Sequence, residues 1–211
     1  MGSSSKDAFK TLLEHPRIWR GREAVANAGV VSTGYPQLDA QLPGRGWRRG
    51  ALTEIAVEHY GTGELSLLTP ALEALSQGER WIVWVAPPFI PYAPALAAAG
   101  INLSRIMLVH PATETDALWA MGQALKTGAC AAVLAWAGQV SEQKLRRLQL
   151  AAEAGDSWGV LFRPPQAFAR GSPAALRLKL VPDGQQLKVE IVKVRGGRPG
   201  EVWLEPVKSE E

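Results

Sequence analysis

The stretch Gly50-Ala-Leu-Thr-Glu-Ile-Ala-Val-Glu-His-Tyr-Gly-Thr-Gly-Glu-Leu-Ser66 decides the fold of this chain. Its first part, Ala51–Glu58, is a short apolar run that predicts a buried strand. Gly61 and Gly63 predict a loop, and the residues that follow predict a helix over about 65–77. A strand, a glycine-containing loop and a helix in this order form the framework of a phosphate-binding loop, G-x-x-x-x-G-K-[ST]. The stretch therefore predicts an α/β protein.

The residues that would bind phosphate in such a loop are missing. Glu64 stands where the lysine belongs and Leu65 where the hydroxyl belongs, so Gly61, Gly63, Glu64 and Leu65 form a degenerate loop. A carboxylate turns an attraction of about 4 kcal/mol at 4 Å into a repulsion of similar size. Pro70 would also kink the following helix, or restart it with Thr69 as its N-cap. We expect no bound nucleotide or other cofactor; the alternative is an unusual phosphate site made by Gly61 and Gly63 alone.

The rest of the chain continues the alternation of strands and helices. Apolar runs predict strands over 81–86, 106–110, 130–137 and 157–163, and helices over 92–99, 113–126 and 141–154, with Ser141 as an N-cap. Two alternating segments, 176–181 and 187–194, surround Asp183-Gly184 and predict a hairpin, followed by a strand at 201–204. This order predicts a mainly parallel sheet flanked by helices, with antiparallel strands at the C-terminal end. We expect an N-terminal arm over 1–30 and one core domain over 31–207.

Composition excludes several classes of protein. The 211 residues carry a net charge of +3 and contain a single cysteine, Cys130. No run approaches the roughly 18 apolar residues of a membrane span, and a lone cysteine is typical of a reducing compartment, so we expect a cytoplasmic protein without a membrane partner. The three histidines are scattered, so no metal site is predicted. No catalytic set of residues is found, and we expect no enzyme.

The opening of the core resembles that of the RecA recombinase. The run Ser32-Thr-Gly34 with Leu38-Asp39, leading to Glu54-Ile55, carries the resemblance, which extends over about 31–193. It implies a catalytic glutamate where this chain has Pro87 or Pro88, and a Walker B aspartate where it has Trp136. With the lysine also lost, the resemblance implies a pseudo-ATPase. The segments 137–140 and 164–172 are too short to be RecA's DNA-binding loops, so filament-style DNA binding is not expected.

Four short motifs resemble the ImuA family within this fold: Trp19-Arg-Gly-Arg22, Leu42–Trp47, Gly63–Ser66 and Arg163–Pro165. The resemblance implies a non-enzymatic adaptor in SOS-induced translesion synthesis and mutagenic DNA repair. It would bridge an ImuB-like Y-family protein and an error-prone polymerase, with RecA as a further candidate partner. The alternative is the SulA type of cell-division inhibitor, which has a similar fold without ATPase residues and blocks FtsZ.

Two segments combine basic and aromatic residues and are candidate partner-binding sites. One lies in the arm and the other in a glycine-rich turn; the residues are Ile18, Trp19, Arg20, Arg22, Arg45, Trp47, Arg48 and Arg49. In the alternative interpretation, the arm packs on its own sheet and the turn is solvated, with Trp47 against the core edge. The turn is also a candidate for weak DNA contact. Lys144, Arg146 and Arg147 lie on a helix face that is either solvated or in contact with phosphates.

Overall fold

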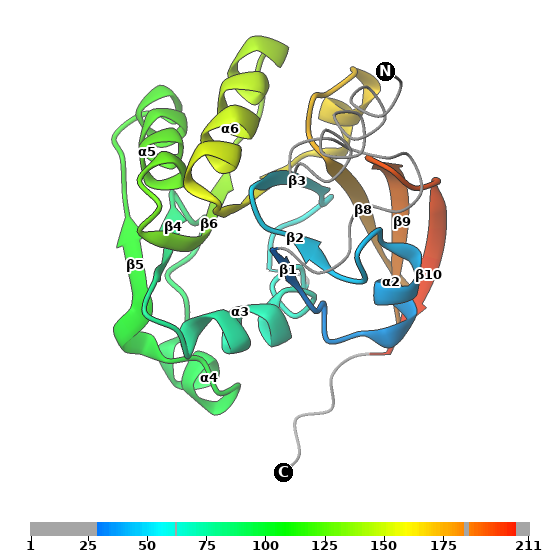
Figure 1. The fold of residues 1–211 in the computed structure, drawn as a ribbon, viewed down its shortest axis with the longest axis horizontal. Coiled ribbons are helices and arrows are strands. Elements are labelled where there is room, and N and C mark those ends of the chain that lie inside the picture. Colours follow the sequence, from blue (N-terminus) through cyan, green and yellow to red (C-terminus); the bar gives the residue numbers. More distant parts are fainter. Residues whose placement is uncertain (1–28, 62, 184–185, 206–211) are drawn as a thin grey trace, which may run out of the picture.

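The computed structural model describes residues 29–61, 63–183 and 186–205 (Figure 1). Its centre is an eight-stranded sheet in the order β10-β9-β8-β3-β7-β6-β4-β5. The strands are β3 (Ala51–Ala56), β4 (Trp81–Val85), β5 (Ile106–Val109), β6 (Cys130–Trp136), β7 (Trp158–Arg163), β8 (Leu176–Asp183), β9 (Gln186–Val194) and β10 (Gly200–Leu204). From β5 to β8 all neighbours are parallel, whereas β8, β9 and β10 pair antiparallel. The predicted sheet, mainly parallel with antiparallel strands at its C-terminal end, is confirmed.

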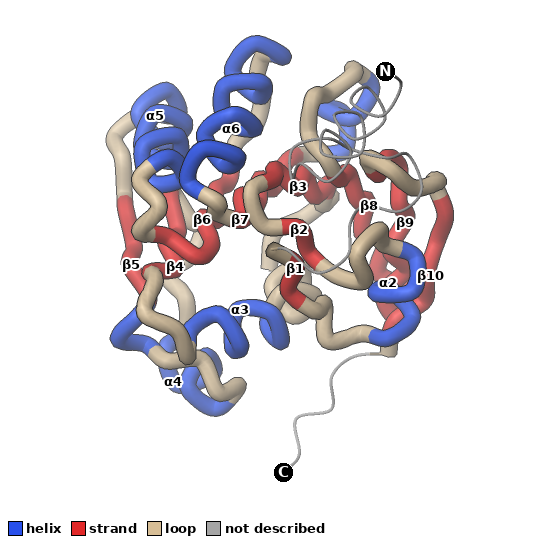
Figure 2. The backbone as a smooth tube through the Cα atoms, in the orientation of Figure 1, coloured by secondary structure: helices blue, strands red, loops and turns tan. Residues whose placement is uncertain are grey.

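Helices cover both faces of the sheet (Figure 2). Helices α5 (Glu114–Lys126) and α6 (Glu142–Gly155) lie on one face, and α3 (Thr69–Ser76) and α4 (Ala93–Ala98) lie on the other. The core is accordingly divided into two apolar clusters, one containing Met121 and Leu148, the other containing Leu72 and Trp84. The strands between them are nearly continuous apolar runs because they are buried on both faces.

Helices α5 and α6 each begin after an N-cap side chain, but α6 ends one residue later than the sequence predicts. The side chains of Thr113 and Ser141 accept hydrogen bonds from the backbone of α5 and α6 as N-caps. Gly155, expected just past the end of α6, is instead its last residue, and Asp156 takes the left-handed conformation with φ of 48°. A Cβ at Gly155 would lie 1.9 Å from the carbonyl oxygen of Leu125 on α5. The glycine is required there by helix contact rather than by the turn.

Helix α3 begins later than the apolar pattern predicts. It starts at Thr69, with Pro70 in its first turn and Leu68 rather than Thr69 as the N-cap residue. The Thr69 hydroxyl donates to the carbonyl of Leu65 at 3.0 Å. Proline therefore restarts the helix after the turn at 64–68, as its missing N–H and fixed φ predict.

The segment before β3 has structure that the pattern analysis missed. Helix α2 (Pro36–Gln41) lies beside β10, and β1 (Val30–Val31) pairs with β2 (Trp47–Arg48). The carboxylate of Asp39 accepts hydrogen bonds from the Ser32 hydroxyl at 2.7 Å and from the Thr33 N–H at 2.9 Å. The Ser-Thr-Gly and Leu-Asp signature thus fixes its own turn. Two 3-10 helices, Leu103–Arg105 and Pro165–Ala169, complete the connections. Among the described residues no helix is long and apolar enough to cross a membrane.

Candidate functional site

The degenerate phosphate loop is closed by its own carboxylate. Both oxygens of Glu64 accept the Gly61 N–H, at 2.9 and 3.0 Å, and the Glu64 residue is only 4% exposed. In a working loop, such N–H groups face the phosphates. The negative charge of Glu64 thus occupies the place of a ligand and repels another anion. Gly61, with φ of 84°, and Gly63, with φ of 100°, allow the tight turn.

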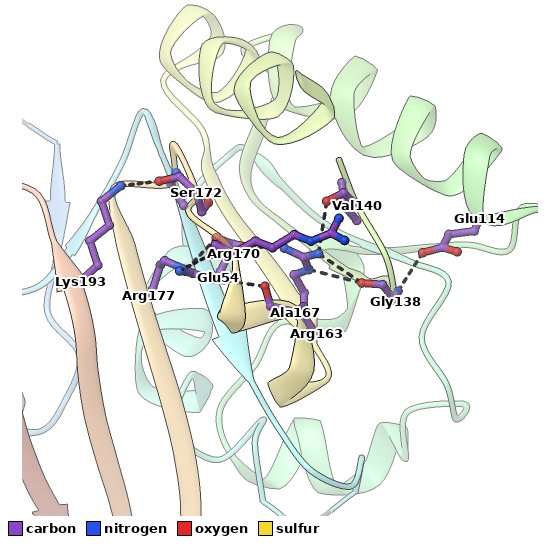
Figure 3. A network of polar contacts seen from close by, with 11 residues as sticks. Glu54, Glu114, Gly138, Val140, Arg163, Ala167, Arg170, Ser172, Arg177 and Lys193 are labelled. Carbon is purple, nitrogen blue, oxygen red and sulfur yellow. Dashed lines mark hydrogen bonds and ion pairs between the residues drawn. The ribbon is translucent and has the colours of Figure 1, made fainter. Parts of the chain in front are cut away.

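A second carboxylate takes a backbone donor at the same edge of the sheet. Glu114, in the first turn of α5, accepts the Gly138 N–H at 2.7 Å, just beyond the end of β6 (Figure 3). Beside Glu114 lies an open cleft of about 350 Å³, lined by Tyr60 and Trp136 among others. Burial, followed by the charges of Glu64 and Glu114, raises the pKa of Tyr60 above its usual range. The cleft is therefore unsuited to phosphate.

The positions matched to catalytic residues of RecA-like ATPases have packing roles. Trp136 is 7% exposed, and its ring stacks on Phe162 with centroids 4.9 Å apart. Ala86, with φ of 52°, directly follows β4 and leads into Pro87 and Pro88. Left-handed φ in a residue other than glycine is strained, and here it redirects the chain away from the sheet. Within the described ranges, no group of three His, Cys, Asp or Glu residues is placed to hold a metal ion.

Behind the cleft lies a buried charge network that the sequence analysis missed (Figure 3). Glu54 on β3 is fully buried between Arg163 on β7 and Arg177 on β8. Arg163 Nη1 lies 2.6 Å from Glu54 Oε1, and Arg177 Nε lies 3.2 Å from Glu54 Oε2. The first contact is a hydrogen-bonded ion pair. The second is a close electrostatic contact outside hydrogen-bond angles, which leaves both atoms without a hydrogen bond. Burial lowers the pKa of Arg177, and the charge of Glu54 opposes that shift.

Arg163 and Arg177 also donate hydrogen bonds to loop carbonyls, so the network connects the sheet to two loops. Arg163 donates to the carbonyl of Val140 at 3.3 Å, in the loop between β6 and α6. Arg177 donates to the carbonyl of Arg170 at 3.0 Å, and its guanidinium lies 4.0 Å from the centroid of the Phe168 ring. Glu54 therefore links the short loops at 137–140 and 164–172 through its two arginines. The signal in the sequence was a charged residue in each of three strands that are buried or partly buried for most of their length.

The predicted partner-binding residues of the basic turn are only partly at the surface. Arg45 and Arg48 are exposed, whereas Arg49 forms an ion pair with Asp156. Trp47 is fully buried and stacks on Trp158 with centroids 5.1 Å apart. Because the Trp47 ring is buried, it is not available to contact a partner. This agrees with the alternative interpretation, in which Trp47 packs against the core. The arm residues Ile18, Trp19, Arg20 and Arg22 lie outside the described residues, so their role stays a prediction.

A different apolar surface was not foreseen. Phe89, Ile90 and Tyr92 follow β4 and are 65%, 83% and 72% exposed. We call residues 87–92 the apolar loop. Adjacent exposed apolar side chains of this size mark contact sites in soluble proteins. The available signal was a run of apolar and aromatic residues between prolines, where no regular element could bury them.

Comparisons with known proteins identify the family. The sequence model described as "Cell division inhibitor SulA" matches residues 50–159, more than half of the chain, and the chain belongs to this family. SulA of Serratia proteamaculans is 27% identical over 125 residues, 59% of this chain and 74% of that protein. SulA of Edwardsiella piscicida is 34% identical over 100 residues, 47% of this chain and 60% of that protein. The crystal structure of SulA from Pseudomonas aeruginosa is 29% identical, with a TM-score of 0.47, covering 54% of this chain and 97% of that one.

These matches correct the family and partner predictions. The resemblance to ImuA is wrong, and with it the adaptor role in translesion synthesis and the ImuB-like and polymerase partners. Three of its four motifs, Trp19–Arg22, Leu42–Trp47 and Arg163–Pro165, lie outside the matched residues 50–159. Short turn motifs rich in Gly, Pro and Trp carried that assignment. The strands and helices between them carry the SulA match, so the alternative interpretation is the supported one.

Proposed function

We propose that this protein is an SOS-induced inhibitor of cell division that binds FtsZ and acts by occupancy, without catalysis. The observation that carries the proposal is the match to the cell division inhibitor SulA over residues 50–159. That range runs from the start of β3 into β7 and contains both the degenerate phosphate loop and the apolar loop. The function therefore belongs to the parallel half of the sheet and its helices.

The absence of catalysis is inferred from the two internal carboxylates. Glu64 accepts the Gly61 N–H, and Glu114 accepts the Gly138 N–H at the edge of the cleft. We infer a RecA-like core over 31–207 that lacks ATPase residues, preceded by an arm over 1–30. The position of β3 between β7 and β8, with the degenerate loop at its carboxyl end, supports this fold assignment. The protein would then consume no nucleotide during inhibition.

We propose the apolar loop as the surface that contacts FtsZ. Phe89, Ile90 and Tyr92 place three exposed large apolar side chains within four residues, which no other stretch of the described residues does. The loop lies inside the matched range, and the strained Ala86 with two prolines holds it outside the sheet. A preformed apolar loop loses little conformational entropy on binding, which favours affinity.

The test is assembly of purified FtsZ with GTP, followed by light scattering, with increasing amounts of this protein. Binding by occupancy predicts that assembly stops near equimolar amounts, and that Mg-ATP does not change the dose. The double variant Ile90→Asp/Tyr92→Ser should require at least about 30-fold more protein, because losing two central anchors costs about 2 kcal/mol or more.

The matched control is Val192→Asp/Trp203→Ser. These residues are 40% and 43% exposed on β9 and β10, outside the matched range. The control should inhibit as the parent protein does. Full inhibition by the apolar-loop variant would refute the proposed surface. No effect of the parent protein on FtsZ assembly at tenfold excess would refute the proposed function itself.

A further inference from the structure

Two arginine-bearing turns meet at the amino ends of β3 and β8. The first is the turn at 42–49, and the second is the β9–β10 turn at 195–199. A Cβ at Gly197 would lie 3.0 Å from Pro43, and Arg48 and Arg195 line the same small cavity. The Arg195 N–H donates to the carbonyl of Ala175 at 2.7 Å, which fixes the second turn beside β8. We call Arg45, Arg48, Arg49, Arg195 and Arg198 the basic surface.

The charges of this surface are only partly balanced. Arg49 pairs with Asp156, and Arg195 lies 3.5 Å from Glu153. Arg45, Arg48 and Arg198 are exposed and have no acidic partner among the described residues. The exposed guanidinium groups of Arg45, Arg48 and Arg198 therefore give the described part of this surface a local excess of positive charge.

Arg45 has a left-handed backbone conformation, which is uncommon for a residue other than glycine. Its φ is 61°, directly after Gly44 with φ of 82°. The Arg45 N–H donates to the carbonyl of Leu42 at 2.9 Å, closing a turn with Pro43 and Gly44 at its centre. Left-handed φ in a long side chain costs free energy and occurs preferentially at functional positions.

The chemistry of the surface points to phosphate rather than to an apolar or base-stacking partner. Arginine suits phosphate because its planar guanidinium donates two parallel hydrogen bonds. None of the exposed large apolar side chains lies in either turn, and Trp47 is buried. Single-stranded nucleic acid needs aromatic stacking platforms, and membrane surfaces favour apolar side chains that insert. A surface with arginine alone fits the backbone of a duplex, where phosphates supply the contacts.

We propose that the basic surface binds the phosphate backbone of double-stranded DNA without reading its sequence. All five arginines lie outside the residues 50–159 that match the SulA family, so the proposal is independent of FtsZ binding. The surface is also at the amino edge of the parallel strands, opposite the edge that carries Glu64. The two activities would occupy separate parts of the molecule.

The experiment measures fluorescence anisotropy of a labelled 20-base-pair duplex with the full chain, from about 50 to 300 mM salt. The test variant is Arg45→Ala/Arg48→Ala/Arg198→Ala. The matched control is Lys144→Ala/Arg146→Ala/Arg147→Ala, which removes three exposed positive charges from α6. Losing three phosphate contacts should make the negative slope of log K against log salt shallower by about 2–3. It should also weaken binding at 0.1 M salt by about 100-fold. The control should change the affinity less than about 5-fold.

A conservative variant keeps the proposal testable if the alanine variant unfolds. Arg45→Lys/Arg48→Lys/Arg198→Lys preserves the charges and should retain the salt slope within about 1, with weaker affinity. Absence of duplex binding at 50 mM salt would overturn the proposal. Equal weakening by the test and control variants, or tighter binding of single-stranded DNA, poly-glutamate or vesicles of phosphatidylserine, would also overturn it.

Discussion

Replacing Glu54 by alanine tests whether the buried charge network holds the core together. The Glu54 side chain is fully buried. Its carboxylate oxygens lie 2.6 Å from a guanidinium nitrogen of Arg163 and 3.2 Å from one of Arg177. Coulomb's law at an effective dielectric of about 20 gives attractions of about 6 and 5 kcal/mol at these distances. Most of this attraction offsets the cost of burying three charged groups.

Removing Glu54 alone leaves the desolvation cost of the two buried arginines but removes their attraction to the carboxylate. Arg163 and Arg177 stay buried, repel each other and lose their common counter-ion. Breaking such a pair destabilises a protein by about 3–5 kcal/mol. Since 1 kcal/mol corresponds to about 2–4 °C in a domain of this size, we expect the melting temperature to fall by about 10 °C or more.

The assay is unfolding in urea and by heat, followed by circular dichroism. Glu54→Gln keeps the shape and one acceptor oxygen, so its loss of stability should be smaller than that of Glu54→Ala. The surface control is Glu201→Ala, which breaks the ion pair with Lys188 at 2.8 Å and should cost less than about 1 kcal/mol. A Glu54→Ala protein that unfolds within 2 °C of this control would refute the reasoning.

Two further predictions concern Glu64 in the degenerate phosphate loop and the buried thiol of Cys130. Glu64→Lys restores the lysine of the phosphate loop but leaves Leu65 in place of the metal-binding hydroxyl, so titration calorimetry should detect no Mg-ATP binding; micromolar affinity would contradict the assignment of a degenerate loop. Burial raises the pKa of the Cys130 thiol, so the reactive thiolate fraction at pH 8 is reduced. Cys130 should react with a disulfide reagent at least about 100-fold more slowly in the native protein than in 8 M urea, and equal rates would show that the thiol is accessible.

The sheet could be predicted from the sequence because its strands are buried on both faces. Runs such as Cys130–Trp136 lack polar residues, and the helices between them carry caps such as Thr113 and Ser141. Helix α2 and the β1–β2 pair were missed because they are short and are fixed by side-chain contacts such as Asp39 with Ser32. Local patterns do not report contacts of that kind.

The candidate site was harder to predict because its members come from separate strands. The sequence shows that Glu64 and Trp136 stand where a nucleotide-binding site of the RecA type would need other residues, but it does not show what these two residues contact. Glu54, Arg163 and Arg177 were not recognised as a unit, because only the parallel register of β3 with β7 and β8 brings them together. The burial of Trp47 likewise follows from its contact with Trp158, more than a hundred residues away in the chain.

The loop at 61–66 shows how a carboxylate can close a glycine-containing turn from within. Gly61 and Gly63 have left-handed conformations, and the Gly61 N–H points to the side chain of Glu64. In an ATPase a phosphate accepts such donors; here the Glu64 carboxylate accepts the Gly61 N–H from within the loop. Because a backbone donor that loses water without gaining an acceptor costs about 1–3 kcal/mol, this internal acceptor stabilises the turn. The same carboxylate places a negative charge at the loop, so the group that stabilises the turn also disfavours a bound anion.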